Sequence, residues 1–199
     1  MLPLLEVNYA NAQVVPEQDE DIIAEEITYP GNEGTMKGYL ARPKKDAQYG
    51  AVVVIHENRG LNPHIKDVAR RVAKAGFIGM APDALSPFGG TPVNEDEARE
   101  LIGKLDAVKN TDNFLKGLEY LRSRKEANGK TGCVGFCWGG GMANQLAVHD
   151  PKLSAAVAFY GRQPSEKDAS KIKARLQLHY GSLGERINDT APIMFTEEV

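Results

Sequence analysis

The chain has 199 residues, of which 42% are hydrophobic and 26% are charged, and its formal net charge is −3 at pH 7. This length and composition favour one globular domain with a hydrophobic core of its own. No basic block or basic amphipathic stripe points to nucleic acid or a membrane surface as a partner. No apolar run approaches the roughly 18 residues of a membrane-spanning helix.

The N-terminal segment allows two interpretations. Met1–Leu5 is apolar but short, and Ala10-Asn11-Ala12 has the spacing of a signal-peptide cleavage site, yet a basic start is absent. The segment is either the end of an export leader or a solvated N-terminus. We assign residues 1–20 to a leader remnant or disordered N-terminus and residues 21–199 to the domain. Localisation stays open too: cytoplasmic for this chain, or periplasmic after export if the segment is a leader.

The first half of the domain alternates strand-like and helix-like patterns. Two strands at Ile22–Tyr29 and Lys37–Ala41 precede a continuous β-branched run at Ala51–Ile55, which is typical of a buried parallel strand. Apolar residues then recur at helical spacing over residues 65–73, and Phe77–Ala81 is the next strand.

In the second half, Asn94 opens a helix whose apolar face runs from Ala98 to Val108, and a second helix covers Asp112–Arg124. The remaining elements are the strand Thr131–Phe136, the helix Trp138–Val148 and the strands Ser154–Tyr160 and Leu176–Tyr180. This repetition predicts an α/β fold, a mostly parallel sheet with helices on both faces. Because the chain ends soon after the last strand, we expect a further strand and the closing helix to be missing.

A glycine-rich motif marks a candidate nucleophile. In Gly135-Phe136-Cys137-Trp138-Gly139, the cysteine lies between a predicted strand and a predicted helix, as in a nucleophile elbow. The dipole of the following helix favours a thiolate there, and the Trp138 N–H would point at an oxyanion. The alternative is a tight turn with a structural cysteine. Cys133, about 13 Å away along an extended strand, is too distant for a disulfide, and the pair lacks the further ligands of a zinc site.

A polar loop, His56-Glu57-Asn58-Arg59-Gly60, directly follows the buried strand at residues 51–55. Such loops at the carboxyl end of a parallel strand carry the sites of this architecture, and here the loop would supply a second oxyanion donor. A loop that only caps the next helix is the alternative, and His56 by itself is more often a structural histidine than a base.

These motifs together resemble the dienelactone hydrolase (carboxymethylenebutenolidase) family, an α/β-hydrolase fold. They are His56–His64, Ala81–Asp83, Gly135–Gly141 and Phe159–Gly161, in the order of the family, and the resemblance covers about residues 26–188. It implies a small-molecule ester or lactone substrate, acyl transfer to sulfur and then to water, and no metal or organic cofactor. The oligomeric state is unknown.

The resemblance also implies roles for individual residues. Cys137 would be the nucleophile, and Glu57 would assist thiol activation. The backbone N–H groups of Asn58 and Trp138 would form the oxyanion hole, and Tyr160 matches an active-site tyrosine.

The chain departs from the family pattern near its C-terminus. Gly184 stands where the family has an aspartate, with Glu185 one step along, and none of the four histidines matches the catalytic one. Pro87 occupies the approximate place of an arginine that binds the substrate carboxylate, for which Arg59 could partly compensate. We therefore expect this chain to be a poor esterase. The alternatives are an inactive or merely thiol-reactive fragment of the same fold, and a ligand-binding module without chemistry.

Overall fold

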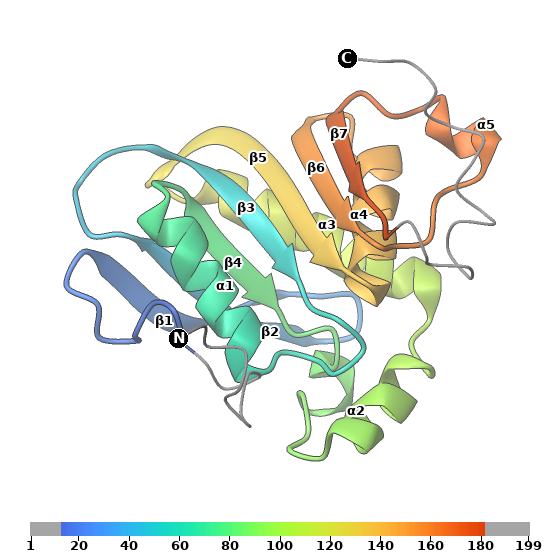
Figure 1. Cartoon of the computed structure of the whole chain (residues 1–199), viewed down its shortest axis with the longest axis horizontal. Helices are drawn as coiled ribbons and strands as arrows, with labels where there is room; N and C mark the ends of the chain where they lie inside the picture. Colours follow the sequence, from blue (N-terminus) through green and yellow to red (C-terminus); the bar gives the residue numbers. More distant parts are fainter. Residues whose placement is uncertain (1–12, 182–199) are drawn as a thin grey trace.

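The computed structural model describes residues 13–181, which form one seven-stranded sheet (Figure 1). The strand order is β1-β2-β4-β3-β5-β6-β7. The strands are β1 (Ile22–Pro30), β2 (Thr35–Pro43), β3 (Tyr49–Ile55), β4 (Ile78–Pro82), β5 (Ala127–Phe136), β6 (Leu153–Phe159) and β7 (Arg175–His179). The five strands from β4 to β7 in this order are parallel, and β1 and β2 pair antiparallel at one edge. The predicted α/β fold with a mostly parallel sheet is confirmed.

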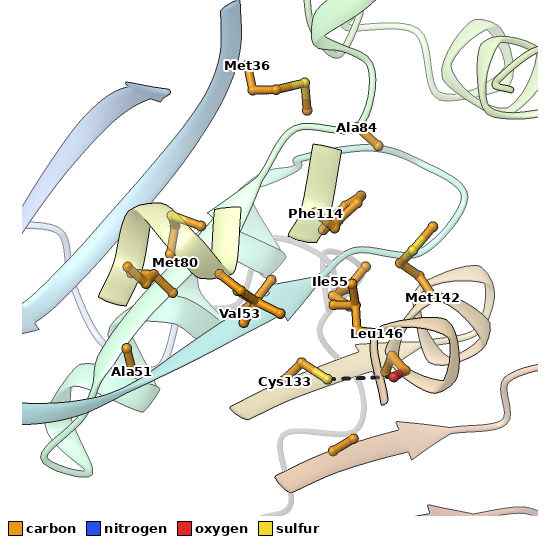
Figure 2. Close-up of a cluster of buried hydrophobic side chains, with 14 of the residues drawn as sticks. Met36, Ala51, Val53, Ile55, Met80, Ala84, Phe114, Cys133, Met142 and Leu146 are labelled. Carbon is orange, nitrogen blue, oxygen red and sulfur yellow. Dashed lines mark hydrogen bonds between the residues drawn. The ribbon is translucent and has the colours of Figure 1, made fainter. Parts of the chain in front are cut away.

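Helices cover both faces of the sheet, because the strands bury side chains on both sides. The helix α1 (Pro63–Lys74) lies on one face, and α3 (Ala107–Ser123) and α4 (Trp138–His149) lie on the other (Figure 1). In β3, Val54 packs toward α1, whereas Val53 and Ile55 enter the larger core against α3 and α4 (Figure 2). All three side chains are fully buried, which explains the continuous β-branched run.

The helices after β4 begin and end at different residues from those predicted. The helix α2 (Glu95–Ile102) stops before Leu105 and Val108, and α3 begins at Ala107 rather than at residue 112. The predicted boundaries were wrong because apolar residues continue at helical spacing across the break between α2 and α3. Asp106 caps α3 by accepting a hydrogen bond from the Lys109 N–H, and Val108 is exposed. Short 3-10 and α turns at Ser86–Phe88 and Glu166–Ala169 (α5) were not predicted.

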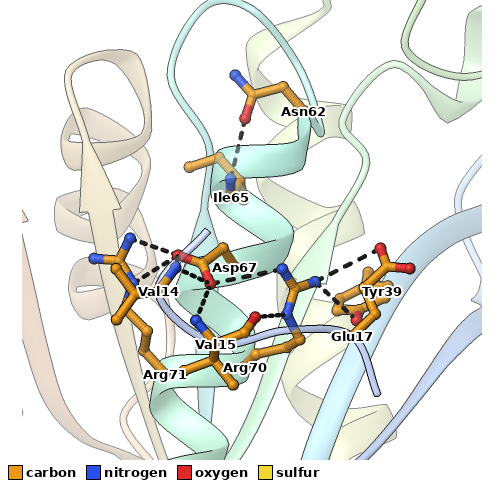
Figure 3. A network of polar contacts seen from close by, with 9 residues as sticks. All are labelled: Val14, Val15, Glu17, Tyr39, Asn62, Ile65, Asp67, Arg70 and Arg71. Carbon is orange, nitrogen blue, oxygen red and sulfur yellow. Dashed lines mark hydrogen bonds and ion pairs between the residues drawn. The ribbon is translucent and has the colours of Figure 1, made fainter. Parts of the chain in front are cut away.

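Residues 13–21 form a strap across α1, so the described fold starts before residue 21 (Figure 3). The N–H groups of Val14 and Val15 donate to the buried carboxylate of Asp67 on α1, and Val15 is itself buried. Arg70, also fully buried, donates to the Val15 carbonyl oxygen at 2.6 Å and to the Tyr39 hydroxyl at 3.1 Å. Residues 1–12 lie outside the described range. Within the described range, no helix is long and apolar enough to cross a membrane.

Candidate active site

Cys137 sits at the bend between β5 and α4, as predicted for an elbow. Its φ of 55° is positive, a conformation that a side chain other than glycine adopts only under constraint. The Cys137 N–H donates to the Phe159 carbonyl oxygen at 2.9 Å, and its own carbonyl oxygen accepts from Gly140 and Gly141. These bonds fix the bend from both sides, with the thiol partly exposed at the N-terminus of α4.

The glycines around the bend are required by close backbone contacts. A Cβ on Gly135 would lie 1.9 Å from the carbonyl oxygen of Gly139, and a Cβ on Gly161 would lie 2.1 Å from the carbonyl carbon of Gly140. Neither neighbour can move without shifting the backbone. The glycine-rich motif therefore lets β5, α4 and the end of β6 meet at Cys137.

Glu57 and Tyr160 meet at the same edge of the sheet. The Tyr160 hydroxyl donates to Glu57 Oε1 at 3.0 Å, and Tyr160 directly follows β6 with a φ of 42°. Burial, together with the hydrogen bond to Glu57 and the negative charges of Glu57 and Cys137, raises the pKa of Tyr160 to about 12. Tyr160 thus contacts the Glu57 carboxylate directly and lies near enough to Cys137 for its charge to act on the phenol.

His56 is a structural residue in this fold. Its ring is fully buried, with Nδ1 2.6 Å from the Glu57 carbonyl oxygen, and Nε2 accepts from the Ala84 N–H at 3.2 Å. The proton is therefore on Nδ1, because a carbonyl oxygen only accepts and an N–H only donates. Burial lowers the pKa of the ring, which favours this neutral form. With both nitrogens occupied, His56 joins the ends of β3 and β4 and has no free atom to act as a base.

The loop after β3 is tied to the loop after β4. The carboxylate of Asp83 accepts from both the N–H and the hydroxyl of Thr91, and the same hydroxyl accepts from the Leu61 N–H at 2.8 Å. Gly60, with a φ of 74°, lies so close to Thr91 that an added Cβ would be 2.2 Å from its hydroxyl oxygen. The position of the Glu57–Asn58 segment thus depends on Thr91, 30 or more residues away.

The two predicted oxyanion donors belong to two different segments of the chain. Asn58 is in the loop after β3, and Trp138 is the first residue of α4. Within the described part of the chain, no hydrogen-bond partner takes the N–H of Asn58 or of Trp138. The Trp138 ring stacks on His56 with a centroid distance of 5.3 Å, which orients the start of α4.

A cavity of about 500 Å³ opens beside Cys137. Its apolar lining includes Ile102, Leu105 and Met142, and its polar lining includes Asn110, Thr111, Gln145, Arg162 and Gln163. Asn110 and Arg162 were not among the predicted site residues. Neither belongs to a motif, and only the packing of α3 and of the loop after β6 brings them to Cys137.

Arg59 and Cys133 do not line this cavity. The Arg59 guanidinium pairs with Asp96 at 3.3 Å and with Glu95 at 3.6 Å, both at the start of α2. Cys133 is buried in β5 with its thiol directed at the Ala143 carbonyl oxygen (Figure 2), and burial raises its pKa. Gly184 and Glu185 lie outside the described residues. No group of three or more metal-ligating side chains gathers within residues 13–181.

Comparison with known proteins supports the resemblance. A protein of Escherichia coli named as a hydrolase fragment, YghX, is 54% identical over 109 residues, which cover 53% of this chain and 93% of that protein. An Escherichia coli carboxymethylenebutenolidase, by name, is 33% identical over 165 residues, or 80% of this chain. This chain spans only 60% of that relative's length.

Solved structures agree in fold. A Klebsiella pneumoniae protein named as a dienelactone hydrolase has a TM-score of 0.70 at 28% identity, over 79% of this chain and 71% of that one. A metagenomic dienelactone hydrolase-like promiscuous phosphotriesterase has a TM-score of 0.74 at 25% identity, over 85% of this chain and 74% of that one. The sequence model of the dienelactone hydrolase family matches residues 36–199. The chain therefore belongs to the dienelactone hydrolase family.

Proposed function

We propose that this chain is a carboxylic ester or lactone hydrolase in which Cys137 is the nucleophile. The observation that carries the proposal is the strained bend at Cys137, which presents the thiol at the N-terminus of α4 and beside a cavity of about 500 Å³. Backbone strain of this kind is retained where a fold over-determines it, and it is common at nucleophile elbows. Membership of the family supplies the reaction class.

In the proposed reaction, the Cys137 sulfur attacks the carbonyl carbon of the ester. A C–S bond forms, the negative charge moves to the carbonyl oxygen, and the N–H groups of Asn58 and Trp138 hold that oxyanion. Collapse breaks the ester C–O bond and releases the alcohol, which takes up a proton. Water then cleaves the thioester to give the acid and the free thiol. No metal or organic cofactor takes part in these steps.

The proposal assigns supporting roles in this chemistry to Glu57 and Tyr160. The Glu57 carboxylate would assist loss of the thiol proton, and the hydrogen bond from Tyr160 holds that carboxylate in place. We also propose Tyr160 as part of the substrate-binding wall, because its ring is partly exposed at the same edge. Arg59, paired with α2, would reach a substrate only after leaving Asp96.

The test is hydrolysis of a small activated ester by the wild type, Cys137→Ala and Cys133→Ala. We expect turnover and a covalent acyl adduct, seen as a mass increase, in the wild type and in Cys133→Ala. Cys137→Ala should lose both. Turnover that survives in Cys137→Ala would overturn the assignment of the nucleophile.

A second candidate is a thiol-reactive protein on the same fold. The observation that favours it is that none of the four histidines, all within residues 13–181, is hydrogen-bonded to the Cys137 sulfur. Acylation without turnover would identify this case: the ester would add one acyl group to Cys137, and the adduct would not be released. Turnover at about 1–10³ s⁻¹, typical of enzymes, would exclude it.

A further inference from the structure

One asparagine in the wall of the Cys137 cavity has no apparent structural use. Asn110 on α3 is only 3% exposed, and it lines the cavity. Its side-chain oxygen is buried without a hydrogen-bond partner, and its amide nitrogen has none among residues 13–181. Buried polar groups are nearly always hydrogen-bonded, because an unpaired one costs about 1–3 kcal/mol. Such an exception requires an explanation.

The next buried asparagine on α3 shows the ordinary case. Asn113, one turn further along and 4% exposed, accepts a hydrogen bond from the Asn32 N–H at 2.8 Å. It holds the turn between β1 and β2 and is a structural residue. Asn110 faces the cavity instead, so its missing partner is one that a ligand could provide.

Two hydroxyl groups of the cavity wall are already occupied. The Thr111 hydroxyl donates to the Ala107 carbonyl oxygen at 2.7 Å, and the Ser165 hydroxyl donates to Asp168 at 2.7 Å. Arg162 has an exposed side chain without an ion pair in the described structure, so water can solvate its guanidinium. Asn110 and Gln163 are the two lining residues whose side-chain oxygen is buried without a hydrogen-bond partner. Gln163 is only half-buried, so Asn110, at 3% exposed, is the more deeply buried of the two.

The chemistry of an amide selects the ligand group. One end of the Asn110 amide donates and the other accepts, and the two ends are similar in size. A hydroxyl group can satisfy either end, because it both donates and accepts, whereas a carboxylate only accepts. Ile102, Leu105 and Met142 give the same cavity an apolar wall that suits a short carbon chain. The cavity thus fits a hydroxyalkyl group.

We propose that Asn110 forms a specificity subsite that binds a hydroxyl group of the substrate, so that the preferred esters carry a hydroxyalkyl chain. This rests on the proposed function, since Cys137 defines where the ester carbonyl lies. Asn110 acts on binding and does not take part in the bond-breaking steps. One neutral hydrogen bond made in a buried site gives a preference of about 10-fold over the matched alkyl ester.

The experiment measures alkylation of Cys137, so it does not depend on ester turnover. The probes are chloroacetamides whose nitrogen carries a hydroxyalkyl chain of two to four carbons, each paired with an alkyl probe of the same length. The thiolate displaces chloride and forms a thioether, and intact mass gives the rate. Iodoacetamide, which has no chain, normalises each variant for thiol reactivity.

We expect the wild type to react about 10-fold faster with the best hydroxyalkyl probe than with its alkyl pair. Asn110→Leu should lose this preference and keep its rate with iodoacetamide. Thr111→Val is the matched control, because its hydroxyl is already used within α3, and it should keep the preference. Asn110→Ser, whose hydroxyl can still donate and accept a hydrogen bond, should keep part of it.

Three results would overturn the proposal in different ways. Equal rates with the paired probes, together with normal reaction with iodoacetamide, would rule out the subsite but not the proposed nucleophile. If Cys137 reacted with none of the probes, both the subsite and the proposed nucleophile would be ruled out. Fastest reaction with a carboxyalkyl probe, abolished by Arg162→Gln, would show that the cavity selects an anion through Arg162 instead.

Discussion

The Tyr160 hydroxyl donates a hydrogen bond of 3.0 Å to the Glu57 carboxylate, and the two residues are 103 positions apart in sequence. Tyr160 directly follows β6, and Glu57 is the second residue after β3. In the sheet, β5 lies between these two strands and ends next to Cys137. The bond therefore connects the two sides of the elbow above the strand that carries the thiol.

Glu57→Gln is expected to lower the pKa of Tyr160 from about 12 toward the ordinary value of 10. A neutral amide no longer repels the phenolate, although burial, the largest cause of the shift, remains. The measurement is the ultraviolet titration of tyrosine ionisation, with Tyr160→Phe subtracted to isolate this phenol. An unchanged titration in Glu57→Gln would mean that the pair is not formed in solution.

His56→Leu is expected to destabilise the fold by about 1–3 kcal/mol at pH 8, because the Ala84 N–H is left buried and unpaired. The pKa of His56 is lowered in the folded state, so the unfolded state binds a proton first as the pH falls below about 6.5. Wild-type stability should fall through this window, and the variant should lack that loss. Urea unfolding at pH 8 and pH 5.5 measures both effects. A variant with normal stability and no ester hydrolysis would instead identify His56 as a base.

Asp67→Asn is expected to destabilise the fold by about 3 kcal/mol at pH 7, because it breaks a buried charge network that holds the strap. Although burial alone would raise the pKa of Asp67, the N–H groups of Val14 and Val15 and the Arg71 guanidinium keep it below its usual value. The stabilisation is complete above the unfolded pKa of about 4 and is lost as the pH falls through the lower folded value. The difference in unfolding free energy between wild type and variant should therefore shrink in acid.

Asp21→Asn is the control for the strap, because Asp21 pairs with Lys74 at the surface and its side chain is 80% exposed. The substitution should change the free energy of unfolding by close to zero, as for most exposed ion pairs. An equal loss in both variants would mean that the buried network has no special role.

Gly161→Ala is expected to cost at least about 3 kcal/mol, since the new Cβ would overlap the backbone of Gly140 and push α4 away from β6. Gly141→Ala, one residue along α4 from Gly140, is the matched variant: its Cβ has no neighbour closer than 3.5 Å. It should fold normally, because alanine suits a helix. Thermal unfolding compares the two, and equal stabilities would argue against the tight contact.

The fold and the elbow could be predicted because their causes are local in sequence. The β-branched run of β3 and the glycines around Cys137 each encode a backbone path without reference to distant residues. The break between α2 and α3 could not be found from apolar spacing, because the pattern continues to Val108 while Asp106 ends it by capping. Here a side-chain hydrogen bond decided the boundary.

The roles of individual polar residues depended on partners that only the tertiary structure supplies. His56 became structural through the Ala84 N–H, which is in another loop. Arg59 was drawn to the acidic start of α2, an element with a predicted start but no predicted contact with that loop. Asn110 belongs to no motif. Its place in a cavity wall, without a hydrogen-bond partner for its side-chain oxygen, is visible only once α3 is placed against α4.

The bond between Thr91 and Asp83 has a consequence for how the sequence can change. Thr91 does not line the cavity, yet its hydroxyl receives the Leu61 N–H and its methyl group and hydroxyl fill the space beside Gly60. The loop that holds Asn58 therefore cannot drift independently of the loop after β4. A substitution at Thr91 or a lengthening of that loop would need a compensating change near Gly60. Evolution and protein engineers alike would have to alter the two loops as a pair.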